Sequence, residues 1–273
     1  MQPPLGAQLA KNAVVLTLAL SFAANFMVRL LLTLLLSAWP AARGMLWLAA
    51  LVEGVLFLGL AWLVAQLPDA RPGLGLERTS ALILGAAITL GVFVHGPADF
   101  VEAVVQQWSP LPETVLRERL QQLLPDGAAA RALLLVAVAG VVPFAEEAFF
   151  RGPLFTRLLQ STGAFVAILV SSVCFTLSHG EARSFPALFL VALLLGWLRF
   201  QTQSLWPCFL LHAAFNATTL LVLFASPKQE NLAPVPSVTA LAAGLALTLL
   251  AAFAIKQEQR RRSASLPAGA TGS

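Results

Sequence analysis

Eight apolar stretches of roughly membrane-spanning length run through this chain and restrict what it can fold into. They cover residues 13–38, 45–66, 79–95, 131–159, 163–179, 186–200, 205–225 and 236–255. A helix of about 20 residues crosses the hydrocarbon core of a bilayer, and it satisfies its own backbone polar groups there. The sequence therefore predicts an all-α fold, a polytopic membrane helical bundle with about eight transmembrane helices.

The composition agrees with a membrane-embedded chain. Hydrophobic residues make up 58% of the sequence, charged residues 11%, and the mean hydropathy is +0.81. A soluble domain carries about 25% charged residues. The net charge of +4 does not indicate nucleic acid, because much of it lies in Lys256–Arg262, directly after the last apolar stretch. Positive charge at this position is a topology signal and favours cytoplasmic termini. We therefore expect a multi-pass protein of the cell (inner) membrane, with the lipid bilayer as its first partner.

The order of apolar and polar segments divides the chain into four parts. We expect N-terminal transmembrane helices with an interfacial connector in 1–130, a helical core that carries buried polar residues in 131–225, a last transmembrane helix in 226–255, and a basic, disordered tail in 256–273.

The connector between the third and fourth stretches, residues 96–127, carries too many charges for a span. Apolar residues recur in it at helical spacing, opposite the charged positions: Val115, Leu116, Leu120, Leu123 and Leu124. This pattern predicts an amphipathic helix lying in the membrane interface. Such a helix could cover or gate a site, or it could be a solvated cap without a functional role.

Two adjacent acidic residues, Glu146 and Glu147, interrupt the fourth apolar stretch, and Arg151 follows one turn later. An ionisable group in hydrocarbon is costly without partners, so it indicates a functional site. Glu147 and Arg151 share a helix face, whereas neighbouring residues point about 100° apart. We therefore expect one glutamate to address a cavity and the other to stabilise the structure.

Two of the three histidines also lie in apolar stretches. His212 and Asn216 are four residues apart and share one helix face. Glu146 and His179 are symmetric about position 162.5, and the turn signal Ser161–Gly163 falls on that midpoint. In an antiparallel hairpin of straight helices, this symmetry places both side chains at the same depth, where they can meet.

Glutamate, histidine and carboxamide side chains together suit a hydrolase. A glutamate beside a neutral histidine can take a proton from water, and a second histidine with an amide can stabilise an oxyanion. A His, His and Glu set could also bind zinc, although no His-Glu-x-x-His helix is present. No Gly-x-Ser-x-Gly elbow occurs either.

Three motifs in this order resemble those of the CPBP family, which comprises the type II CAAX prenyl endopeptidases and the related bacterial Abi proteins. They are Glu146-Glu147-x-x-x-Arg151, Phe175-x-x-x-His179 and His212-x-x-x-Asn216. They occupy about residues 143–217, and the remainder of the chain resembles the family only in being apolar and helical.

The resemblance implies an eight-helix intramembrane protease that cleaves a protein or peptide substrate near its C-terminus. In it, Glu146 and His179 would activate water, while His212 and Asn216 would form the oxyanion site. Glu147 and Arg151 would be a supporting ion pair. The resemblance implies no cofactor, with zinc as the less favoured alternative.

Functions of other classes also fit these residues. A non-catalytic scaffold or immunity protein could retain the fold, and a proton-coupled transporter could use the same buried groups. The transporter would be expected to show paired broken spans in two halves, and none is apparent in the sequence. Outside the motifs, Arg29 and Glu53 lie within the first two apolar stretches and could pair in a structural role.

Overall fold

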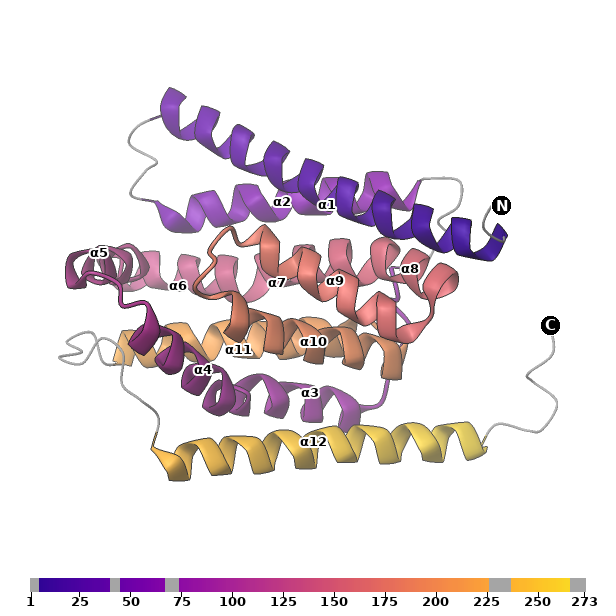
Figure 1. Ribbon diagram of the computed structural model, residues 1–273. Coiled ribbons are helices and arrows are strands. Elements are labelled where there is room, and N and C mark those ends of the chain that lie inside the picture. The colour runs from indigo at the N-terminus through magenta and orange to yellow at the C-terminus, as the bar shows by residue number, and fades with distance from the viewer. Residues whose placement is uncertain (1–4, 40–44, 67–73, 226–236, 266–273) are drawn as a thin grey trace.

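A computed structural model describes residues 5–39, 45–66, 74–225 and 237–265, and this part of the chain is helical with no strand. The long helices run side by side in alternating directions, so that α1 begins and α12 ends at the same end of the bundle (Figure 1). The elements are α1 (Leu5–Ala38), α2 (Leu46–Ala65), α3 (Ala81–Phe93), α4 (His95–Trp108), α5 (Glu113–Leu123), α6 (Ala128–Val136), α7 (Val142–Phe149), α8 (Phe155–Thr162), α9 (Ala164–Ser178), α10 (Phe185–Thr202), α11 (Trp206–Ala225) and α12 (Val238–Ser265).

Seven helical segments of the described chain are long and apolar enough to cross a membrane. The eighth predicted span is α9, which is apolar but has 15 residues, because the chain turns at its end. Large apolar side chains are exposed around the bundle, among them Phe26, Trp62 and Leu249. In water such a surface would be unfavourable, but in a bilayer it faces lipid. The predicted all-α polytopic bundle is confirmed.

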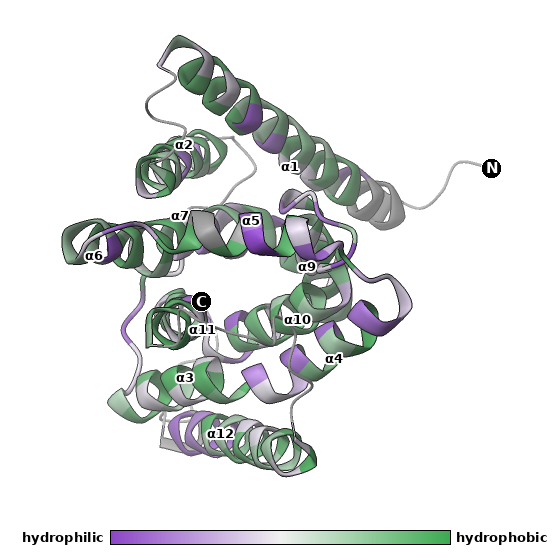
Figure 2. Cartoon of the chain, turned by 90° about the vertical axis from the view of Figure 1, so that its left-hand side faces the viewer, coloured by the Kyte–Doolittle hydropathy of each residue, from purple (hydrophilic) through white to green (hydrophobic). Residues whose placement is uncertain are grey.

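The segment between the third and fourth spans is more helical than its charges suggested. The third span does not end near residue 95, because α3 is followed directly by α4 in one helical segment from Ala81 to Trp108. After it, α5 lies across one end of the bundle, roughly perpendicular to the long helices (Figures 1 and 2). Within α5, Val115 and Leu116 are half-buried whereas Arg117 is exposed. The predicted amphipathic helix is thus confirmed.

The predicted disordered tail requires a correction. The last helix, α12, continues to Ser265, so the basic segment that follows the last apolar stretch is helical. Glu258 and Arg262 stabilise it with an i, i+4 ion pair of 3.2 Å. The rest of the tail, residues 266–273, lies outside the described residues.

The fourth span is not the straight helix that the sequence predicted over residues 131–159. Two π-helical turns, η2 (Ala137–Val141) and η3 (Phe150–Leu154), separate α6, α7 and α8. Gly152 departs from helical geometry with ψ −117°, and Pro153 follows it. Proline restricts the residue before it and cannot donate to the helix ladder, which accounts for the kink.

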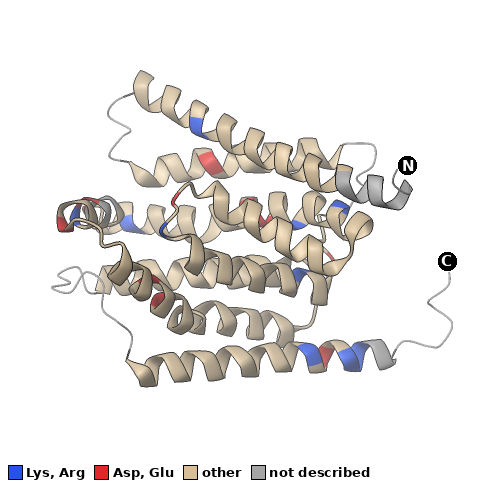
Figure 3. Ribbon diagram, in the orientation of Figure 1, with Lys and Arg blue, Asp and Glu red and all other residues tan. Residues whose placement is uncertain are grey.

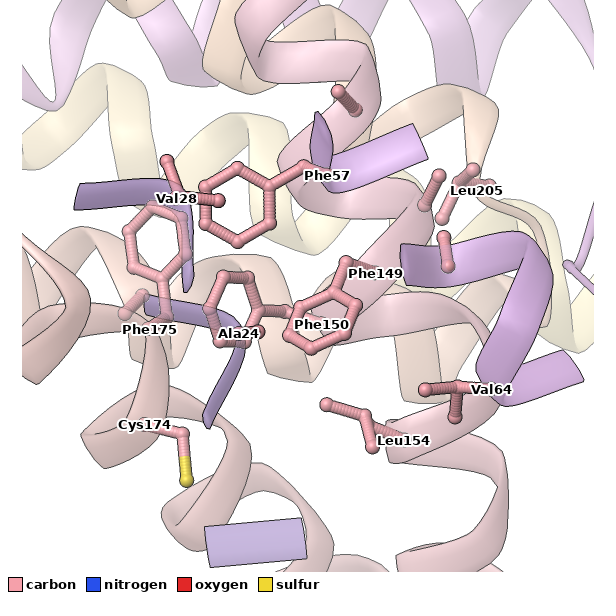
Figure 4. Packing of buried hydrophobic residues seen from close by; sticks show 14 residues of the cluster. Ala24, Val28, Phe57, Val64, Phe149, Phe150, Leu154, Cys174, Phe175 and Leu205 are labelled. Carbon is pink, nitrogen blue, oxygen red and sulfur yellow. The ribbon is translucent and has the colours of Figure 1, made fainter. Parts of the chain in front are cut away.

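An aromatic cluster at the C-terminal end of α7 packs against the neighbouring helices. Phe149 and Phe150 pack edge to face with ring centroids 4.9 Å apart, and Phe57 of α2 and Phe175 of α9 pack against them (Figure 4). Aromatic rings bury large areas and have few rotamers. This cluster therefore fixes α7 between α2 and α9.

Small residues bring the other helices close together. A Cβ atom at Gly91 would lie 2.2 Å from the carbonyl oxygen of Leu211, so α3 and α11 approach at backbone distance. Gly96 and Gly244 allow the same close approach between α4 and α12. A Cβ atom added at either glycine would lie about 3 Å from a backbone atom of the other helix. Close approach through small residues is typical of helix packing in membranes.

Candidate intramembrane active site

The glutamate pair lies on α7, the short helix between the two π-helical turns. Glu146 is 5% exposed and Glu147 is fully buried. Figure 3 shows that charged residues are sparse along the bundle, with only a few between its ends. π-Helical turns are rare in proteins as a whole, but those that do occur often lie at functional sites. Their position on both sides of Glu146 and Glu147 sets this part of α7 apart from the rest of the span.

His212 of α11 lies between the two glutamates. Its Nδ1 atom is 3.0 Å from Oε1 of Glu147, and its Nε2 atom is 3.7 Å from Oε2 of Glu146. The first distance is a hydrogen bond, whereas the second is too long for one. Glu147 therefore holds a neighbouring side chain, whereas Glu146 makes no direct hydrogen bond to the imidazole.

Arg151 completes the support of Glu147. Its Nη1 atom donates to Oε1 of Glu147 at 3.3 Å, and its Nη2 atom donates to the carbonyl oxygen of Ala192 in α10 at 3.1 Å. The guanidinium also lies 4.5 Å from the ring centroid of Phe175, within cation–π distance. The predicted proximity of Glu147 and Arg151 is present, and their side chains are both fully buried.

The hydrogen bond to Glu147 determines what His212 can do. Glu147 is paired with Arg151 as a carboxylate and is an acceptor, so Nδ1 of His212 carries a proton. A neutral ring then presents an acceptor at Nε2, and a protonated ring presents a donor there. Glu147 therefore fixes the orientation of the ring and leaves Nε2 of His212 directed toward Glu146.

Asn216 lies one turn after His212 and is bound to the first π-helical turn. Its Nδ2 atom donates to the carbonyl oxygen of Val138 in η2 at 2.9 Å. A π-helical turn shifts the backbone ladder by one residue, and this leaves a carbonyl oxygen available to a side chain. The amide has a second N–H, so this bond orients Asn216 and still leaves it one donor.

His179 follows directly after α9, and its Nδ1 atom bonds the carbonyl oxygen of Phe175 at 3.0 Å. Because that carbonyl is an acceptor, the neutral ring has its proton on Nδ1 and its lone pair on Nε2. The ring of Phe175 packs against both His179 and His212, with centroid distances of 4.8 and 5.5 Å. Phe175 is thus the contact that connects the two histidines.

The predicted direct meeting of Glu146 and His179 does not appear as a contact. The ion-pair partner of Glu146 is His212, at 3.7 Å. The depth argument assumed straight helices, whereas the kink at Gly152 and the two π-helical turns change both the path and the register of the fourth span.

Sequence reasoning did not assign Glu53 or Arg29 to the site. Their position in the first two apolar stretches was the available signal, since charged residues there are costly. The structure places Arg29 at the end of α9, where its Nη2 atom donates to the carbonyl oxygen of Ser178, next to His179. Glu53 of α2 lies within electrostatic range of His179.

Among the described residues, no group of three or more His, Cys, Asp or Glu side chains is gathered so that it could hold a metal ion. Both nitrogens of His212 face carboxylates, and Nδ1 of His179 is used by a backbone carbonyl. These residues do not converge as a zinc set requires.

These features define the class: an integral multi-pass helical membrane protein with a cluster of buried acidic and basic side chains inside the bundle. Residues 128–218, from the start of α6 into α11, match the family described as type II CAAX prenyl endopeptidase Rce1-like. This segment is thus a CAAX-protease-like domain, and the resemblance seen in the three motifs is confirmed. At family level it implies a peptidase that acts in a bilayer on a peptide substrate. Comparison with curated proteins and with solved structures gives no match.

Proposed function

We propose that the protein is a glutamate-dependent intramembrane endopeptidase of the cell membrane, with cytoplasmic termini. It hydrolyses a peptide bond near the C-terminus of a membrane-associated protein or peptide. The observation that carries the proposal is the buried Glu146 carboxyl, 3.7 Å from Nε2 of a histidine whose other nitrogen is held by Glu147. Because 3.7 Å is too long for a hydrogen bond, this carboxylate oxygen of Glu146 remains available to a water molecule.

In the first step, Glu146 takes a proton from a water molecule, and the water oxygen attacks the carbonyl carbon of the substrate. The negative charge moves to the carbonyl oxygen of the tetrahedral intermediate. His212, protonated at Nε2, and the second N–H of Asn216 donate hydrogen bonds to that oxygen. Donors held in place before the reaction stabilise an oxyanion effectively, because no reorganisation is needed as charge develops.

In the second step, Glu146 gives its proton to the leaving nitrogen, the C–N bond breaks, and the carbonyl re-forms. The products are a carboxylic acid and an amine, and the glutamate returns to its ionised form. His179, with its lone pair on Nε2, accepts a hydrogen bond from the water and orients it. This scheme uses no metal ion or other cofactor.

The experiment compares wild-type protein with Glu146→Gln in proteoliposomes and in cells. Quantitative proteomics of C-terminal peptides should show cleavage products with the wild type and none with Glu146→Gln. The loss should exceed about 100-fold, because general acid–base catalysis contributes at least that much. Glu258→Gln on α12 is the matched control, since it also removes one carboxylate but far from α7.

Folding of the variant must be verified by thermal unfolding, because only a folded inactive protein supports the assignment. Wild-type turnover in Glu146→Gln would refute the role of Glu146. Identical C-terminal peptides with and without wild-type protein would instead favour a non-catalytic scaffold.

A further inference from the structure

The first two helices lie outside the segment that matches the family, yet one of their side chains binds next to His179. Nη2 of Arg29 in α1 donates to the carbonyl oxygen of Ser178 at 2.9 Å. Ser178 is the last residue of α9. The final carbonyl groups of a helix lack partners within it and carry partial negative charge. A guanidinium is therefore well suited to this position.

Gly180 provides the space for this contact. It has φ +68°, a conformation that favours glycine, and it turns the chain after His179. A Cβ atom at this position would lie 2.3 Å from Nη2 and 2.9 Å from Cζ of Arg29. A side chain after His179 would be strained by the turn and would displace the guanidinium from its present position.

His179 is enclosed by these contacts. The residue before it accepts the bond from Arg29, and the residue after it packs under the guanidinium. Its own ring is bound to the carbonyl oxygen of Phe175 within α9. Any shift of the C-terminal end of α9 therefore moves the ring.

We propose that Arg29 is a positioning residue for His179: it fixes the C-terminal end of α9. This inference rests on the proposed function, in which His179 orients the attacking water. It also assigns to α1 a part in the site, and the family match at residues 128–218 does not include this helix.

The test uses Arg29→Met and Arg29→Lys in full-length protein in nanodiscs. Arg29 is on the exposed side of α1, so its removal leaves no cavity in the core. Arg29→Met should lower kcat on the order of tenfold with KM unchanged, as expected for losing one charge-assisted hydrogen bond. Arg29→Lys keeps the charge and should recover part of kcat. Arg183→Met is the matched control, because Arg183 lies in the same loop but donates to Gln106 of α4.

A second measurement does not depend on turnover. The chain has three histidines, so protein labelled with ¹³C-histidine gives three ring signals, and His179→Gln identifies one of them. Arg29→Met should shift the His179 signal and leave those of His95 and His212 in place. Arg183→Met should move none of the three.

Separate outcomes overturn the inference and the proposed function. An unmoved His179 signal in Arg29→Met, or equal losses of kcat in Arg29→Met and Arg183→Met, would overturn the positioning role. Wild-type activity in Glu146→Gln would overturn the catalytic scheme whatever the ring signals show.

A double-mutant cycle of Arg29→Ala and Gly180→Ala adds a further criterion: the effects should be less than additive, because the close contact vanishes once Arg29 is removed.

Discussion

Removal of Arg151 should destabilise the protein strongly, because Glu147 would remain as a buried charge. Both side chains are fully buried, and Arg151 contributes bonds of 3.3 Å to Glu147 and 3.1 Å to the carbonyl oxygen of Ala192. Breaking a buried ion pair from one side costs about 3–5 kcal/mol. Arg151→Met keeps most of the side-chain volume, so we expect a loss within that range that arises from charge and not from a cavity.

The same chain contains a matched control pair. Glu113 and Arg117 of α5 have the same i, i+4 order and hydrogen-bond at 2.9 Å, but their side chains are 67% and 58% exposed. Exposed pairs of this kind contribute about 0.3–0.5 kcal/mol. Arg117→Met should therefore change stability by less than about 1 kcal/mol. The contrast isolates burial as the cause, because residue types and spacing are the same.

The double variant Arg151→Met with Glu147→Gln separates charge from packing. The glutamine carries no charge, yet its carbonyl oxygen can still accept the Nδ1 proton of His212. We expect the double variant to be more stable than Arg151→Met alone. The assay is reversible unfolding in mild detergent, followed by far-UV circular dichroism. If Arg151→Met and Arg117→Met cost the same, or if the second substitution recovers nothing, the electrostatic reasoning is refuted.

Three further predictions concern the site and the packing. Asn216→Ala removes an oxyanion donor and should lower kcat by about 100- to 1,000-fold, as measured with a C-terminal peptide substrate; a change confined to KM would contradict this role. Chelator treatment of purified protein should leave turnover intact, and a loss that zinc restores would support the metalloprotease alternative. Gly91→Leu forces a side chain against the carbonyl oxygen of Leu211, and overpacking of about 1–3 kcal/mol should lower the melting temperature; an unchanged temperature would show that α3 and α11 can separate freely.

The sequence predicted the fold well, because each apolar stretch had to satisfy its backbone internally and helices are the simple solution. It also predicted that Glu147 and Arg151 lie together, since i, i+4 spacing is a local property. The contact between His212 and both glutamates was not predicted. That contact depends on how α11 packs against α7, and no short-range pattern encodes it.

The predicted contact between Glu146 and His179 failed because the backbone of the fourth span is irregular. The depth argument for Glu146 and His179 counted residues along ideal helices, but Gly152 and Pro153 break the ladder of the fourth span. The Gly-Pro pair was a visible signal for a kink. The π-helical turn at Ala137–Val141 has no comparable sequence signature, so its effect on Asn216 could be recognised only in three dimensions.

The two π-helical turns have a consequence for how such a site tolerates change. Each inserts one residue into the helical winding, and one residue corresponds to a rotation of about 100°. Deleting one residue within η2 would rotate α6 relative to α7 and would leave the carboxylates facing α11. Such a rotation would spare the eight residues of α7 but not the rest of the site. The turn η2 holds the carbonyl oxygen of Val138 that Asn216 binds, and η3 carries Arg151, which must keep its spacing to Glu147. In this span, short insertions and deletions are therefore expected to fall ahead of η2 or after η3.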